Sequence, residues 1–135
     1  MKKLLLPLFA CFAFVAAAFA ADSAAPAKIA DIAIPELKAA IAAGKVALID
    51  VNGTASYASG HIPGAIDFAV SKDKLATLLP ADKSTLVVAY CSNERCGAYK
   101  RGANAALALG YTNVKHLSAG IAGWKKAGEP TEAAK

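Results

Sequence analysis

Two cysteines five positions apart are the residues of this chain best suited to chemistry. Cys91 and Cys96 enclose the polar stretch Ser-Asn-Glu-Arg, in which Arg95 supplies a cation. A cysteine acts as a nucleophile in its thiolate form, which nearby cations and helix N-termini favour. The pair therefore suggests thiol chemistry on a small anionic substrate, or a disulfide between the two sulfur atoms.

The elements around Cys91 are those expected to activate a thiol. The clearest strand pattern in the chain, 85–90, ends directly before Cys91, and a helix pattern follows at 97–109. In a parallel α/β sheet, ligands bind beyond the carboxyl ends of strands, where the next helix presents unpaired amides. These amides predict a lowered pKa for Cys91 and a concave site for an anion or a bound sulfur atom.

Other interpretations of the same residues stay open. Cys91 could be a buried apolar residue at a strand end, with Arg95 a solvated loop charge. The spacing differs from the Cys-x5-Arg loop of cysteine phosphatases, which disfavours phosphate-ester hydrolysis. The two cysteines could chelate a soft ion such as copper(I), but the spacing is unusual for structural zinc. We assign no metal site and expect no cofactor.

The two histidines carry weaker signals. His61 lies in the sharply bent stretch Gly-His-Ile-Pro-Gly, where its ring is expected to satisfy backbone groups rather than act in catalysis. His116 falls within a predicted strand and is a still weaker candidate.

Helix and strand patterns alternate along the chain and predict an α/β fold with a mostly parallel sheet. The strand at 46–51 is apolar on both faces, as in a buried parallel strand. The other expected strands are 65–68, 85–90 and 113–117. The expected helices are 35–43, a short piece at 55–58, one capped by Ser71 and reaching Leu79, one at 97–109, and a segment at 120–127.

The N-terminal residues have the pattern of an export signal. Lys2 and Lys3 precede an apolar run over 4–18, and Ala-Phe-Ala at 18–20 offers a small-x-small cleavage site. The run is short for a membrane span, so we expect no stable membrane association after cleavage. The expected organisation is a signal peptide at 1–20, a flexible leader at 21–28 and one folded domain at 29–132.

Export would place the domain in an oxidising compartment such as the periplasm, where Cys91 and Cys96 could form a disulfide. The chain has 15 basic and 10 acidic side chains, and the lysines are scattered among acidic residues. No basic stripe with interleaved aromatics is visible, so we expect no nucleic-acid partner. A modest positive field suits small anions, and we expect a monomer.

Three stretches, in order, resemble the signatures of the rhodanese family, over about 32–130. The first is Leu48-Ile49-Asp50-Val51, followed by Tyr57 and Gly60-His61-Ile62-Pro63-Gly64-Ala65. The second is Val87-Val88-Ala89-Tyr90-Cys91, which is similar to the family's central strand and active-site cysteine. The third is Leu109-Gly110-Tyr111-Thr112-Asn113-Val114, then Ala119-Gly120 and Gly123-Trp124 with Gly128 and Pro130.

The resemblance implies a three-layer rhodanese-like fold and a periplasmic single-domain sulfurtransferase. Cys91 would take sulfane sulfur from a donor such as thiosulfate, and the resulting persulfide would yield it to cyanide or a thiol. Arg95 would orient the donor. The resemblance also implies a substrate-binding loop whose amides stabilise the persulfide, formed by Ser92, Asn93, Glu94, Arg95, Cys96 and Gly97.

The sequence departs from the family pattern at two places. Asn52 stands where the family commonly has arginine, and the loop carries Cys96 and lacks the usual glycine. Cys96 would be incidental, a resolving thiol that releases the persulfide, or a disulfide partner of Cys91. The alternatives to sulfur transfer are a thiol-redox or soft-metal-binding module that uses both cysteines, and a rhodanese-like binding domain without turnover.

Overall fold

A computed structural model describes residues 28–134 and contains a five-stranded sheet in which every pair of neighbouring strands is parallel. The predicted signal peptide, and the leader up to residue 27, lie outside the described residues. The sheet has the order β1-β5-β4-β2-β3, so β4 lies at its centre. The strands are β1 (Ala30–Asp31), β2 (Val46–Asp50), β3 (Ile66–Asp67), β4 (Leu86–Tyr90) and β5 (Val114–Leu117).

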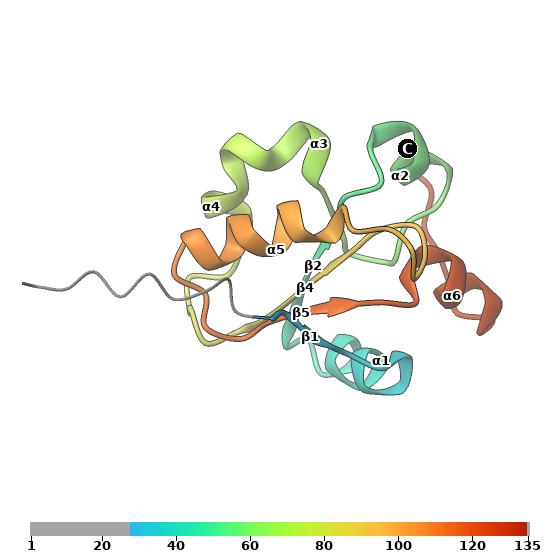
Figure 1. The fold of residues 1–135 in the computed structure, drawn as a ribbon, viewed down its shortest axis with the longest axis horizontal. Coiled ribbons are helices and arrows are strands. Elements are labelled where there is room, and N and C mark those ends of the chain that lie inside the picture. Colours follow the sequence, from blue (N-terminus) through green and yellow to red (C-terminus); the bar gives the residue numbers. More distant parts are fainter. Residues whose placement is uncertain (1–27, 135) are drawn as a thin grey trace, which may run out of the picture.

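Helices cover both faces of this sheet, which gives three layers (Figure 1). In that view α3, α4 and α5 lie above the sheet and α1 lies below it, while α6 lies at its right-hand end and packs into the same core as α1. The helices are α1 (Ile34–Ala42), α2 (Thr54–Ser59), α3 (Phe68–Ser71), the 3-10 helix η1 (Lys72–Lys74), α4 (Leu75–Leu78), α5 (Tyr99–Ala108) and α6 (Gly120–Lys126). The predicted α/β class with a mostly parallel sheet is confirmed. Within residues 28–134, no helix has the length and apolar character needed to cross a membrane.

The central strand β4 divides its side chains between two apolar cores, as the two-residue period of a strand requires. Val88 and Tyr90 join the core that includes Leu37 of α1 and Trp124 of α6. Val87 and Ala89 join the core beneath α5, and Cys91 continues this alternation. The strand therefore directs the Cys91 side chain toward the layer of α5.

Helix α5 approaches the sheet closely through Gly102. A Cβ atom at Gly102 would lie 2.8 Å from Cγ2 of Ile49 and 2.9 Å from Cγ1 of Val51. Glycine is therefore required for α5 to lie so near the end of β2. The close approach places the first turn of α5 beside the carboxyl end of β4.

The predicted helix from Ser71 to Leu79 is wrong in its start and its continuity. The helical segment begins at Phe68 and is divided among α3, η1 and α4. Asp67, at the end of β3, is the N-cap, and its carboxylate accepts a hydrogen bond from the Ala69 amide at 3.0 Å. Asp67 caps the helical segment in place of Ser71, because Asp67 leaves the strand in the extended conformation that a cap needs.

Other predicted elements differ from the structure by one or two residues at their ends, and two differences affect the description of the site. The two-residue strand β1 was not predicted, because a strand this short shows no periodic pattern. Helix α5 begins at Tyr99 rather than at residue 97, so the loop that follows β4 extends over 91–98. This segment is called the thiol loop below.

Candidate active site

Cys91 lies at the carboxyl end of the central strand, and only 2% of the residue is exposed. The backbone amides of Tyr99 and Ser92 lie near its sulfur, where they favour the thiolate. Its thiol donates a hydrogen bond to the backbone oxygen of Cys96, with a distance of 2.9 Å from sulfur to oxygen. The predicted arrangement of strand, thiol and helix amides is therefore present.

The predicted lowering of the Cys91 pKa is wrong in this structure. Burial is the main cause that raises the pKa of Cys91, and its interaction with the Cys96 thiol raises it further. The hydrogen bonds from Tyr99 and Ser92 act in the opposite direction and are outweighed. Desolvation disfavours the charged form of a thiol, and a second thiol beside it adds to this effect.

Cys96 is the more acidic of the two cysteines. Burial opposes its thiolate, but hydrogen bonds from the Cys91 thiol, the amides of Ser92 and Ala98 and the Ser92 hydroxyl together lower the pKa of Cys96 to about 7. The residue is partly exposed, and both cysteines are free thiols. The Ser92 amide, which the sequence assigned to Cys91, thus also favours the Cys96 thiolate.

Helix α6 fixes the position of the thiol loop from the opposite layer. The amide of Ile121 donates to the Cys91 carbonyl, and the amide of Ala122 donates to the Ser92 carbonyl, each at 2.9 Å. Gly120 precedes them with a φ of +61°, and a Cβ there would lie 2.6 to 2.7 Å from backbone atoms of residues 91–93. The first turn of α6 therefore binds the carbonyls of Cys91 and Ser92, whereas the Cys96 carbonyl faces the Cys91 sulfur.

The loop is also closed by Asn93. Its side-chain oxygen accepts a hydrogen bond from the Arg95 amide, and its carbonyl accepts one from the Cys96 amide, both at 3.0 Å. Side chains of asparagine commonly stabilise turns in this way. These bonds bring Cys96 back toward Cys91 within a short loop.

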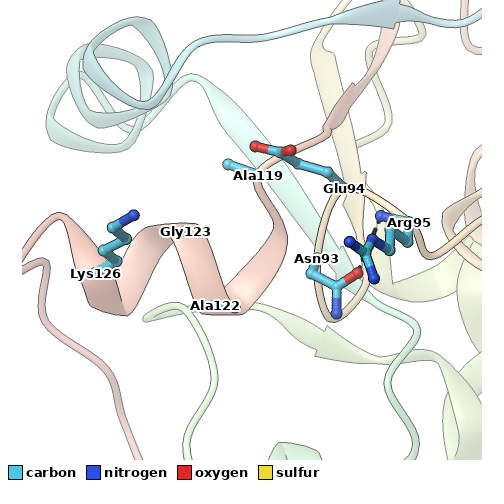
Figure 2. Close-up of a pocket in the computed structure, with 7 residues that line it drawn as sticks. All are labelled: Asn93, Glu94, Arg95, Ala119, Ala122, Gly123 and Lys126. Atoms are coloured by element: carbon cyan, nitrogen blue, oxygen red, sulfur yellow. Dashed lines mark hydrogen bonds between the residues drawn. The ribbon is translucent and has the colours of Figure 1, made fainter.

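An open pocket of about 340 Å³ lies between the thiol loop and α6. Figure 2 shows Arg95 on the loop and Lys126 on α6 at opposite ends of this pocket, with Glu94 between the two elements. Its lining residues are Asn93, Glu94, Arg95, Ala119, Ala122, Gly123 and Lys126. Two cations and one carboxylate therefore border a hollow next to the loop that bears both thiols.

The predicted loop residues thus separate into two groups. Asn93, Glu94 and Arg95 line the pocket, whereas Ser92 and Cys96 interact with sulfur atoms. Gly97 is exposed and its α-carbon faces open space. Sequence reasoning missed Lys126 and the role of Gly120. The small residues Ala119, Gly120, Ala122 and Gly123 were the one available signal, because small residues permit close approach of α6 to the loop.

His61 has the structural role that its sequence context predicted. Its Nδ1 atom lies 2.9 Å from the Tyr57 carbonyl, and its ring stacks on Tyr57 with a centroid distance of 3.7 Å. Its backbone pairs in both directions with Glu132. His116 in β5 stacks on Tyr99 at 4.0 Å, and burial lowers its pKa.

Asn52 replaces the expected arginine with a local hydrogen-bond pair. Its backbone amide and its side-chain amide both donate to Oδ1 of Asp50 at 2.8 Å. The buried Asp50 carboxylate therefore has partners without a cation at this position. Between residues 28 and 134, no three His, Cys, Asp or Glu side chains gather in a way that could hold a metal ion.

The fold and this loop define an α/β domain of the rhodanese class. A family model described as Rhodanese-like domain matches residues 33–127, and the chain belongs to this family. It is 28% identical over 106 residues to the human thiosulfate:glutathione sulfurtransferase, covering 69% of this chain and 90% of that protein. It is 37% identical over 92 residues to an HTH-type transcriptional regulator of Mycobacterium tuberculosis, covering 67% of this chain and 39% of the regulator.

Among solved structures, the fold is similar to thiosulfate sulfurtransferase from Pseudomonas aeruginosa, with a TM-score of 0.63 and 25% identity. That match covers 79% of this chain and 21% of the Pseudomonas chain. The chain thus spans a small part of two of these relatives and nearly all of the human one. A rhodanese-like domain is therefore the unit that they share with it.

Proposed function

We propose that this protein is a sulfurtransferase that carries sulfane sulfur as a persulfide on Cys91. The observation that supports this most strongly is the position of Cys91 at the carboxyl end of β4, with the amides of Ser92 and Tyr99 on its sulfur. The similarity to the human thiosulfate:glutathione sulfurtransferase supports the same reaction class.

The reaction has two half-reactions that share the covalent intermediate. The Cys91 thiolate attacks the outer sulfur of thiosulfate, the sulfur–sulfur bond of the donor breaks, and sulfite leaves with the bonding electron pair. An acceptor, cyanide or a thiolate, then attacks the outer sulfur of the persulfide and restores Cys91. Dividing a transfer into two such steps is the usual advantage of a covalent intermediate. The amides on the sulfur stabilise negative charge in both steps.

Neither cysteine lines the pocket beside the loop, so its charged groups would act on an anionic donor through the field around the loop. Arg95 and Lys126 border it, and each is a fixed cation at neutral pH. Glu94 also borders the pocket, so the field is mixed rather than uniformly positive. We propose that Arg95 orients the donor, because it lies on the same loop as Cys91.

Steady-state formation of thiocyanate from thiosulfate and cyanide tests this proposal. Wild type is expected to turn over, and Arg95→Ala is expected to raise the KM for thiosulfate by roughly tenfold, the effect of one charged hydrogen bond. Lys72→Ala removes an exposed lysine in η1, outside the pocket, and serves as the charge-matched control with an unchanged KM. Absence of thiocyanate with the reduced wild-type protein would rule out the proposed reaction with these substrates.

We further propose that the protein acts in the periplasm after removal of residues 1–20. The supporting observation is the order of a basic start, an apolar run and Ala-Phe-Ala at 18–20. N-terminal sequencing of the protein from a bacterial periplasmic fraction is expected to begin at Ala21. A mature protein that retains Met1 would contradict this proposal.

A further inference from the structure

Cys91 and Cys96 form one unit rather than two separate thiols. The Cys91 thiol donates to the Cys96 carbonyl, with 2.9 Å between sulfur and oxygen, and the Cys96 side chain packs against the apolar core that contains Cys91. Cys91 is buried, whereas Cys96 is partly exposed at the surface of the loop. Any sulfur atom bound to Cys91 would therefore sit within reach of a second sulfur nucleophile.

We propose that Cys96 is a second catalytic residue, which attacks the inner sulfur of the Cys91 persulfide and releases the sulfane sulfur as hydrosulfide. This inference rests on the proposed function, because it requires a persulfide on Cys91. It changes the product, since the sulfur would leave without an external acceptor, and it makes a disulfide an intermediate of the reaction.

The geometry favours attack on the inner sulfur. The inner atom of the persulfide is the Cys91 sulfur itself, which lies 2.9 Å from the carbonyl oxygen of Cys96. The amides of Ile121 and Ala122 fix the Cys91 end of the loop, and the Cys96 amide is bonded to Asn93. Both cysteines are therefore held in one short, closed loop, and the sulfur that Cys96 would attack already contacts the Cys96 residue through its carbonyl.

The step balances in atoms and electrons. The Cys96 thiolate forms a bond to the Cys91 sulfur, the bond between that sulfur and the outer sulfur breaks, and the outer sulfur leaves as hydrosulfide with the electron pair and the proton of the persulfide. The two cysteine sulfurs are oxidised to a disulfide while the sulfane sulfur is reduced. A dithiol reductant must then exchange with the Cys91–Cys96 disulfide to restore both thiols.

The charge state of the pair supports this role. The hydrogen bonds to Cys96 lower its pKa to about 7, so a large fraction is thiolate at neutral pH. The optimum attacking thiol has a pKa near the ambient pH, because a lower pKa also lowers nucleophilicity. Cys96 therefore has the acidity expected of a resolving thiol, whereas the pKa of Cys91 is raised.

A single-turnover experiment with thiosulfate tests the inference. The full chain is reduced, freed of reductant and mixed with excess thiosulfate without cyanide or added thiol. Sulfite, sulfide and the intact protein mass are then measured. Wild type is expected to release sulfite and sulfide in equal amounts and to end two hydrogen atoms lighter, as an intramolecular disulfide.

Matched variants separate the two steps. Cys96→Ser and Cys96→Ala are both expected to release sulfite, to retain one added sulfur atom on Cys91, and to release sulfide at least about a hundredfold more slowly than wild type. Cys91→Ser is expected to release neither product. Circular dichroism of each variant confirms that the fold is intact before the comparison is made.

Each contrary outcome has a distinct meaning. If wild type releases sulfite but keeps the added sulfur on Cys91 and makes no sulfide, Cys96 is not a resolving residue and the proposed sulfurtransferase function stands. If the added sulfur is found on Cys96, attack is on the outer sulfur and the inference is overturned. If no protein releases sulfite, the proposed function fails and the inference with it.

Discussion

Two segments leave neighbouring strands at the same edge of the sheet and use their polar groups in opposite ways. The segment 51–65 follows β2, and the thiol loop follows β4. In segment 51–65 the polar groups bond residues of the fold, both nearby ones and the distant Tyr90 and Glu132. Asn52 donates to Asp50, and the Tyr57 hydroxyl donates to the Ala65 carbonyl at 2.7 Å.

The thiol loop instead divides its backbone groups between two directions. Its first two carbonyls accept hydrogen bonds from α6. The amides of Ser92, of Ala98 and of Tyr99, the first residue of α5, instead lie near the sulfur atoms of Cys91 and Cys96. Position at the carboxyl edge of a parallel sheet is therefore insufficient to make a site. A reactive segment must also carry a nucleophile beside its amides, and segment 51–65 contains no cysteine.

The largest expected effect is the loss of turnover when Cys91 of the thiol loop is replaced. Cys91→Ser should lower kcat/KM for thiocyanate formation by roughly a thousandfold or more, because the sulfur nucleophile is lost. Cys91 is buried, so the free energy of unfolding is measured alongside by urea denaturation. A variant that folds normally and retains turnover would show that the reactive segment has been misassigned.

The next effect concerns the support that α6 gives to the thiol loop. Gly120→Ala and Gly44→Ala both place alanine at a positive φ, +61° and +64°, and each should lose roughly 1–2 kcal/mol from backbone strain. Only at Gly120 would the added Cβ collide with the loop, since nothing lies within 4 Å of a Cβ at Gly44. Turnover should fall at least about tenfold more for Gly120→Ala. Equal turnover in the two variants would contradict the role of α6.

A smaller, pH-dependent difference is expected between the rates at which the two thiols react with an alkylating reagent. Iodoacetamide should label Cys96 before Cys91, because Cys96 is partly exposed and its pKa is lowered to about 7, whereas burial raises the pKa of Cys91. The thiolate is the reactive form, so labelling of Cys96 should rise as the pH increases through 7 and then level off. Peptide mass mapping at several pH values measures this order. Preferential labelling of Cys91 at pH 7 would contradict the assigned acidity.

The smallest effect on turnover is expected in segment 51–65. His61→Gln removes the stack on Tyr57 and should lower the free energy of unfolding by about 1–2 kcal/mol. Its effect on kcat/KM should stay within about twofold, because its ring contacts are with Tyr57 and Glu132. Parallel denaturation and activity assays provide the comparison. A large loss of turnover at unchanged stability would give His61 a catalytic role.

Much of the fold could be predicted from local patterns. The strands β2 and β4 are apolar on both faces, and Cys91 follows the second of them, so its place at the sheet edge required no coordinates. The helix after β3 was misplaced because Asp67 and Ser71 both suit a helix cap, and only the path of the chain out of β3 selects Asp67.

The acidity of the two thiols could not be predicted in the same way. The order of strand, cysteine and helix indicates amides near Cys91, but it does not show which sulfur they reach. That depends on the path of the loop, on the burial of Cys91 and on the bonds from α6. Lys126 was missed for a related reason, since it reaches the pocket only because α6 packs against the loop.

The bonds between α6 and the thiol loop also set an order of events during synthesis. A ribosome makes β4, both cysteines and α5 before it makes Gly120. In such a nascent chain the carbonyls of Cys91 and Ser92 lack the donors that later fix them, so the two thiols are less constrained. Sulfur transfer should therefore begin only when residues 120–122 have joined the fold.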